Sequence, residues 1–178
     1  VNTIAGVPTS FKMLLMGNNI VFNKIKHITI AGASLNPDFL KELKEAFPQA
    51  EIWIGYGLTE AGPRVTAINS TDSMFSTGTV GKAINSVEIK LKNKEILVKS
   101  PSIMLEYLDD KKNTDLKIKE NWLYSGDLGK IDTNGYLYVL GRKDDLFISS
   151  GEKISPLLIE KVLNSLPSTD YCLLAKRE

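Results

Sequence analysis

Three side chains that could handle a nucleotide lie within one glycine-punctuated stretch, Gly55 to Gly62. Tyr56 offers an aromatic face on which a planar base can stack, and Thr59 offers a hydroxyl that can donate to a phosphate oxygen. Glu60 adds a carboxylate, the kind of ligand that Mg²⁺ prefers. The glycines let the backbone accept a ligand at close range. The alternative is a surface turn in which Thr59 caps a helix.

The elements around this stretch predict a parallel sheet. The apolar run Ile52-Trp53-Ile54 leads into it as a buried strand, and residues 27–31 predict a second strand that enters the turn Gly32-Ala33-Ser34. Residues 37–47 between them predict a helix with Pro37 at its first position. Strand, helix and strand at this spacing indicate a βαβ unit. Ligands in such sheets bind at the carboxyl ends of strands, where both glycine turns lie.

The pattern changes after about residue 70. Residues 87–91 and 95–98 alternate with period two, and residues 128–131 and 136–140 flank the turn signal Asn134-Gly135, so we expect an antiparallel sheet or small barrel. From Asp145 the chain predicts a strand, a loop, a helix that begins after Ser155 with Pro156, and a last strand over 171–175. This organisation divides the chain into three units, 1–70, 71–143 and 144–178.

Length, charge and cysteine content limit the classes of protein to which the chain can belong. The chain has 178 residues, a net charge of +1 and one cysteine, Cys172. The charge gives no indication of a nucleic-acid partner, and the single cysteine fits a reducing, cytoplasmic compartment. No apolar run approaches the ~20 residues that a membrane helix needs. The chain begins at Val1 without an initiator methionine, and we expect it to be part of a longer protein.

Three further polar clusters follow in order along the chain. They are Ser125-Gly126-Asp127, Gly141-Arg142-Lys143-Asp144-Asp145 and Ser150-Gly151-Glu152-Lys153. Taken singly, they fit a turn aspartate, a solvated loop and a turn before a helix. The single histidine, His27, flanks a strand, and we assign it no role.

Together these clusters resemble the adenylate-forming superfamily of acyl-CoA synthetases, peptide-synthetase adenylation domains and luciferases. The stretch Tyr56-Gly57-Leu58-Thr59-Glu60 is similar to its fifth core motif, and the three later clusters are similar to its seventh and eighth. Gly32-Ala33-Ser34-Leu35 resembles its Gly-Ala-Pro-Leu turn, and residues 100–104 resemble another recurrent stretch. The likeness covers about Val7 to Ala175. It implies a partial acyl-CoA synthetase-like fold, α/β with an antiparallel, barrel-like section.

The resemblance implies a nucleotide site. Asp127 would accept hydrogen bonds from both ribose hydroxyls of ATP or AMP, and Arg142 would meet the ribose and the neighbouring phosphate. Thr59 would bind the AMP phosphate, and Glu60 would hold Mg²⁺. The adenine slot would lie between backbone and the ring of Tyr56. The backbone positions implied in nucleotide binding are Gly32, Ala33, Ser34, Gly55 and Gly57.

The resemblance also implies a second half-reaction. Asp144 would be the hinge about which a small C-terminal domain swings between adenylation and thioester formation. Gly151 would line the pantetheine channel of coenzyme A or phosphopantetheine, and Lys153 would lie near the CoA phosphates. Ser34 stands where the family usually has proline, Ser125 where it has threonine, and Ile148 where many members have lysine.

The implied activity is that of an AMP-forming ligase, which makes acyl-AMP from a carboxylic acid and ATP and then an acyl-CoA thioester. The family's phosphate loop would lie before Val1 and its late catalytic lysine after Glu178, so we expect this chain alone to be inactive. Two alternatives stay open, the loading of a carrier protein and a non-catalytic nucleotide-binding relic. Intact Glu60, Asp127, Arg142 and Asp144 argue against the relic.

Overall fold

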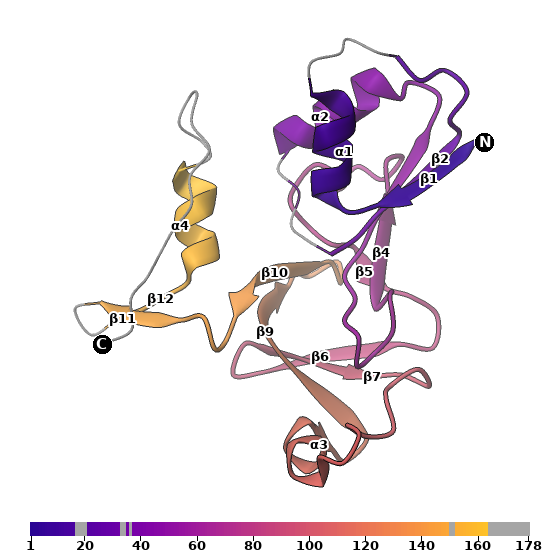
Figure 1. Cartoon of the computed structure of the whole chain (residues 1–178). Helices are drawn as coiled ribbons and strands as arrows, with labels where there is room; N and C mark the ends of the chain where they lie inside the picture. The colour runs from indigo at the N-terminus through magenta and orange to yellow at the C-terminus, as the bar shows by residue number, and fades with distance from the viewer. Residues whose placement is uncertain (17–20, 33–34, 36, 150–151, 164–178) are drawn as a thin grey trace.

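A computed structural model describes residues 1–16, 21–32, 35, 37–149 and 152–163 of the chain. Within these residues the strands form two five-stranded sheets and one two-stranded sheet (Figure 1). In chain order the elements are β1 (Thr3–Gly6), α1 (Pro8–Leu15), β2 (His27–Ile30), α2 (Pro37–Ala46), β3 (Glu51–Ile54), β4 (Thr66–Asn69), β5 (Lys82–Ala83), β6 (Glu88–Lys92), β7 (Glu95–Lys99), α3 (Lys111–Lys117), β8 (Ile118–Lys119), β9 (Trp122–Ile131), β10 (Leu137–Arg142), β11 (Phe147–Ser149), β12 (Glu152–Ile154) and α4 (Pro156–Leu163).

The first sheet has the strand order β1-β2-β3-β4-β5. Strands β1, β2 and β3 run parallel, which confirms the predicted βαβ unit of β2, α2 and β3. Strands β4 and β5 then pair antiparallel, so the sheet extends past residue 70 to Ala83. The carboxyl ends of β2 and β3 therefore lie side by side, with a glycine turn after each.

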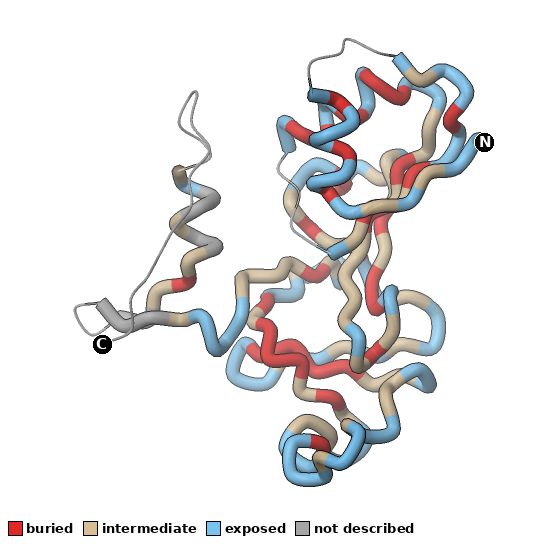
Figure 2. The backbone as a smooth tube through the Cα atoms, viewed as in Figure 1, coloured by how far each residue is buried: buried red, intermediate tan, exposed pale blue. Residues whose placement is uncertain are grey.

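The first sheet packs against α1 and α2 through buried side chains that alternate along its strands. Ile28 and Ile30 on β2, and Ile52 and Ile54 on β3, are all buried and share one core with the apolar faces of α1 and α2 (Figures 1 and 2). A period of two places these side chains on one face of the sheet, while 3.6-residue periodicity supplies the facing stripe of each helix. The helical residues that belong to this core are Phe11, Leu15, Phe39, Leu40, Leu43 and Ala46.

The second sheet is antiparallel, with the order β10-β9-β7-β6 and with β8 paired to β9. Both hairpins predicted from alternation are present, β6 with β7 and β9 with β10. Strand β9 is longer than predicted, because it continues back from Leu128 to Trp122 and pairs there with β7 and β8. Asp127 consequently lies within a strand and not in a turn. These observations confirm the predicted fold class, α/β with an antiparallel section.

The two large sheets are joined by hydrogen bonds at the start of β10. The backbone of Leu137 exchanges bonds with the segment before β5, from Val80 N–H to Leu137 O at 2.9 Å and from Leu137 N–H to Gly81 O at 2.8 Å. The hydroxyl of Tyr136 donates to the carboxylate of Asp72 at 2.9 Å. The antiparallel sheet is thus held at a fixed place against the parallel one.

The last described elements are the hairpin β11–β12 and helix α4, which begins at Pro156 as predicted. Ser155 Oγ donates to Leu140 O at 2.9 Å and ties the start of α4 to β10. The strand predicted over 171–175 lies outside the described residues. Among the helices that are described, none is long and apolar enough to cross a membrane.

At Gly55 the two sides of the turn after β3 approach each other closely. A Cβ atom at this position would lie 2.3 Å from Thr66 O, a backbone atom that cannot move without disrupting β4.

We expect Gly55→Ala to lower the free energy of unfolding by about 3 kcal/mol, as overpacking against backbone does. At Gly78 a Cβ would meet nothing within 4 Å, although its φ is +83°. The control Gly78→Ala should cost only about 1 kcal/mol, for its left-handed backbone. Urea denaturation of both variants measures the difference, and equal losses would contradict the close approach.

Candidate functional site

The carboxylate of Asp127 is the point where three distant parts of the chain meet. Its side chain is 10% exposed and lies in β9. Tyr56, in the turn after β3, donates its hydroxyl hydrogen to Oδ2 at 2.5 Å. Arg142, the last residue of β10, donates from Nη1 to Oδ1 at 2.8 Å. The structure therefore brings together Tyr56, Asp127 and Arg142, as the sequence-based assignment to one site requires.

This arrangement leaves hydrogen-bonding capacity on the carboxylate. An ionised carboxylate offers about four lone-pair sites, and the two side-chain donors use one on each oxygen. The backbone N–H of Asp127 bonds instead to Ser125 Oγ at 3.0 Å. Among the described residues, each oxygen of Asp127 thus accepts one side-chain hydrogen bond and keeps one lone-pair site.

Gly126 is favoured by its left-handed backbone and lies between the ends of two cationic side chains. Its φ is +79°, and a Cβ there would lie 3.1 Å from Lys117 Nζ and 3.2 Å from Arg142 Nη2. Lys117 Nζ also donates to Ser125 O at 3.5 Å, and Arg142 Nη1 to the same oxygen at 3.3 Å. Two cationic side chains thus flank the glycine beside Asp127, which makes this end of the site attractive to an anion.

Tyr56 is held as a neutral donor. Its ring packs against the core of the second sheet, together with Leu58. Burial raises the pKa of the Tyr56 hydroxyl far above its ordinary value, and the hydrogen bond to Asp127 raises it further. On the backbone side, Tyr56 N–H donates to Thr66 Oγ1 at 3.2 Å. Tyr56 therefore links the two sheets: its backbone bonds to Thr66 of β4, and its side chain packs against the core of the second sheet.

Glu60 is held by Tyr107. The Tyr107 hydroxyl donates to Glu60 Oε1 at 2.6 Å, across 47 positions of sequence. This hydrogen bond lowers the pKa of Glu60, with smaller contributions from the charges of Lys117 and Arg142, so the carboxylate is ionised at neutral pH. Burial, and then the bond to Glu60, raise the pKa of Tyr107 to about 12. Sequence reasoning gave no role to Tyr107 or Lys117; only the nearness of Tyr107 to the recurrent stretch 100–104 could have indicated one.

The residues present fit a magnesium ion that a nucleotide brings with it. In the described part of the chain, no group of three or more His, Cys, Asp or Glu side chains could form a metal cage. Mg²⁺ is commonly bound by one or two carboxylates, substrate phosphates and water. A single ionised carboxylate, Glu60, meets that requirement, and it would be the protein ligand.

The other residues assigned from sequence are placed as follows. Thr59 is exposed in the turn beside Glu60, and Gly32 is exposed after β2 with a φ of +96°. Asp144 is exposed between β10 and β11, next to Lys143, whose Nζ is 3.0 Å from Glu95 Oε2. Lys153 lies in β12, where it pairs with Ile148 of β11. Ala33, Ser34 and Gly151 lie outside the described residues.

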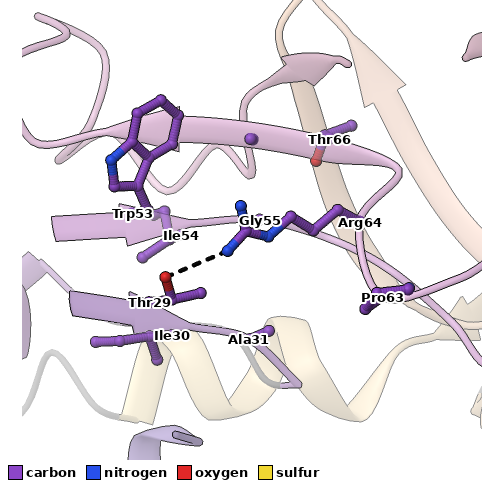
Figure 3. Close-up of a pocket in the computed structure, with 10 residues that line it drawn as sticks. Thr29, Ile30, Ala31, Trp53, Ile54, Gly55, Pro63, Arg64 and Thr66 are labelled. Carbon is purple, nitrogen blue, oxygen red and sulfur yellow. Dashed lines mark hydrogen bonds between the residues drawn. The ribbon is translucent and has the colours of Figure 1, made fainter. Parts of the chain in front are cut away.

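A small pocket opens at the carboxyl ends of β2 and β3, directly before the Tyr56 turn (Figure 3). Trp53 and Gly55 line it from β3 and the turn, and Thr29 and Ala31 line it from β2 and its end. Arg64 reaches across it and donates from Nη2 to Thr29 Oγ1 at 3.2 Å. The pocket combines an apolar floor with one cation and shares Gly55 with the nucleotide turn.

Known proteins resemble this chain over most of its length. The pattern that describes the AMP-binding enzymes matches residues 1–108, which is more than half of the chain. The chain belongs to the family of AMP-binding enzymes. It is 34% identical to 2-succinylbenzoate–CoA ligase of Bacillus subtilis (strain 168) over 94% of this chain and 36% of that protein. It is 30% identical to the mitochondrial acyl-coenzyme A synthetase ACSM4 of Rattus norvegicus, over 94% of this chain and 32% of that protein.

Solved structures of AMP-binding enzymes share the fold. O-succinylbenzoate coenzyme A synthetase from Bacillus subtilis, in complex with ATP and magnesium ion, superposes with a TM-score of 0.82 at 33% identity, over 93% of this chain and 36% of that one. The fatty acyl CoA synthetase of Mycobacterium tuberculosis superposes with a TM-score of 0.74 at 25% identity, over 94% of this chain and 36% of that one. The chain thus spans about a third of the length of these relatives.

Tyr56 should make stability depend on pH in the alkaline range. Because folding raises its pKa, the unfolded chain loses this proton first, at a pH of about 10. The stabilisation from Tyr56 is therefore complete below that pH and is lost as pH rises toward the raised value. Tyr56→Phe should lower the free energy of unfolding by about 2 kcal/mol at pH 7, through the lost bond to a charged group. Above pH 10 the free energy of unfolding of Tyr56→Phe should fall less steeply with pH than that of the wild type.

Urea unfolding between pH 7 and 11 measures both effects. Tyr124→Phe is a matched control, because the Tyr124 hydroxyl accepts from Lys92 on the solvent side of the second sheet. Parallel curves for wild type and Tyr56→Phe across this range would show that Tyr56 does not titrate differently on folding.

Proposed function

We propose that this chain is part of an AMP-forming ligase that activates a carboxylic acid with ATP and transfers the acyl group to coenzyme A. The observation that carries the proposal is the buried Asp127 carboxylate, which accepts one hydrogen bond from Tyr56 and one from Arg142 on separate oxygens. The named relatives are ligases that form CoA thioesters, and this chain spans 36% of the first of them. By itself, the 178-residue chain is expected to bind a nucleotide without completing the reaction.

The polar groups of the site support a specific arrangement of the bound nucleotide. The two ribose hydroxyls would each donate to one oxygen of Asp127, in charge-assisted bonds that contribute roughly 1.5–3 kcal/mol each. The adenine would stack on the ring of Tyr56, with the backbone near Gly32 on its other side. The α-phosphate would lie near Thr59, toward the cations Arg142 and Lys117.

Two displacements complete the proposed reaction. In the first, an oxygen of the acid's carboxylate bonds to the α-phosphorus of ATP, the bond to the bridging oxygen breaks, and pyrophosphate leaves. In the second, a thiolate bonds to the acyl carbon and AMP leaves with the electron pair. Arg142 and Lys117 would stabilise negative charge near the α-phosphate. Glu60 would hold Mg²⁺, which when bound neutralises charge on the phosphates.

The change between half-reactions is proposed to occur at Asp144. The chain would divide into units 1–70, 71–143 and 144–178, with the last one turning about Asp144. That residue is exposed and lies between β10 and β11, outside both strands. Turning would bring Gly151 to the pantetheine channel and Lys153 near the CoA phosphates.

Glu60→Gln tests the first half-reaction in the complete protein. The change keeps the shape of the side chain but removes the charge that would bind Mg²⁺, so acid-dependent exchange between pyrophosphate and ATP should fall by at least about 100-fold, as expected when electrostatic stabilisation of the transition state is lost. The control Glu88→Gln changes an exposed glutamate that pairs with Lys99 on the second sheet, and it should leave exchange unchanged. Exchange near the wild-type rate in Glu60→Gln would refute the metal role.

Asp144→Pro tests the hinge. Proline fixes φ near −65° and prevents a large backbone change, so one orientation of the last unit should be frozen. We expect selective loss of one half-reaction, measured separately as pyrophosphate exchange and as thioester formation from supplied acyl-AMP. Asp144→Ala, which removes the side chain but keeps backbone freedom, should retain both. Full activity of Asp144→Pro in both assays would place the hinge elsewhere.

A further inference from the structure

Residues 100–107, which we name the strap, are hydrogen-bonded to the turn that carries Glu60. Ser102 Oγ donates to Ala61 O at 2.7 Å, and Met104 N–H donates to Glu60 O at 2.8 Å. The Tyr107 hydroxyl donates to Glu60 Oε1 at 2.6 Å. The same strap therefore fixes both the backbone and the carboxylate of Glu60.

The strap is itself anchored at its far end by α3. Tyr107 N–H donates to Thr114 Oγ1 at 2.9 Å, and that hydroxyl donates to Asp110 O at 2.9 Å. The side chain of Asp110 caps the helix through Asn113 N–H at 3.0 Å. Because its backbone is tied to α3 and its hydroxyl to Glu60, Tyr107 has little freedom to turn away from the carboxylate.

We propose that Tyr107 is a positioning residue for Glu60, a role that rests on the proposed function. Among the described residues, no other side chain donates a hydrogen bond to this carboxylate. With Oε1 bonded to Tyr107, rotation of the carboxylate is restricted, and Oε2 is presented to a metal–nucleotide ligand in a fixed direction. Hydrogen-bonded partners of ligating carboxylates commonly affect metal affinity about 10- to 100-fold.

A merely structural role for Tyr107 predicts a different result. If its hydroxyl served only to hold the strap, its removal would lower stability without a specific effect on the metal. Tyr107→Phe keeps the ring and removes only the donor. Metal-free AMP binding reports on Asp127 and Tyr56, so it shows whether the nucleotide site of the variant is intact.

The test is a calorimetric titration of Mg²⁺ into the complete protein saturated with α,β-methylene-ATP. We expect Tyr107→Phe to weaken Mg²⁺ binding about 10-fold and to leave metal-free AMP affinity unchanged. The control Tyr124→Phe removes a hydroxyl that contacts Lys92 and should change neither quantity. In a Glu60→Gln background, Tyr107→Phe should cause no further loss, because its effect passes through Glu60.

The outcomes separate the two proposals. Unchanged Mg²⁺ affinity in Tyr107→Phe, with AMP binding intact, overturns the positioning role and leaves the proposed function standing. An additional loss of about 10-fold in the Glu60→Gln background also overturns it, because Tyr107 would then act by another route. Failure of the wild-type protein to bind either nucleotide overturns the proposed function itself.

Discussion

The site depends on a buried carboxylate in β9 that accepts hydrogen bonds from two other parts of the chain. The Asp127 side chain is 10% exposed, and a carboxylate so far removed from water is costly unless it is paired and hydrogen-bonded. Tyr56 brings a donor from the parallel sheet and Arg142 a charged donor from β10, one on each oxygen. Loss of either partner would leave the charge under-satisfied, so the turn after β3 and the antiparallel sheet are constrained to meet at this carboxylate.

The backbone around this interaction is shaped to permit it. At Gly55 the turn passes so close to Thr66 that no side chain fits, and this approach directs Tyr56 away from the first sheet and into the second core. At Gly126 a left-handed backbone turns β9 so that Lys117 and Arg142 converge beside Asp127. The strap then adds Glu60 to the same site through Tyr107. The polar groups of the site therefore come from the turn after β3, from β9 and from β10, and the two cores hold these elements in place.

Much of the fold and part of the site could be predicted from sequence, because the patterns that indicate them lie within short stretches of the chain. Apolar alternation around residues 28, 30, 52 and 54 and the Asn134-Gly135 turn determined the sheets, and ordered motifs indicated Tyr56, Asp127 and Arg142. Strands β1, β4, β5, β8 and β12 and helix α3 were not predicted, since short elements carry little periodic pattern, and a loop was expected where β12 lies. The bond between Glu60 and Tyr107 joins residues 47 positions apart, and no spacing rule relates them. Asp127 was weighed as a turn residue because Ser125, Gly126 and Asp127, residue types typical of turns, interrupt the pattern of its strand.

The most direct test of the central claim compares the affinity of the protein for AMP and for 2′,3′-dideoxy-AMP, which lacks both ribose hydroxyls. If Asp127 is the ribose acceptor, AMP should bind at least about 10-fold more tightly, because each bond to a charged group contributes roughly 1.5–3 kcal/mol. In Asp127→Ala the two ligands should bind equally. Equal affinities in the wild-type protein, or a preference for AMP that persists in Asp127→Ala, would contradict the assignment of Asp127 as the centre of the nucleotide site.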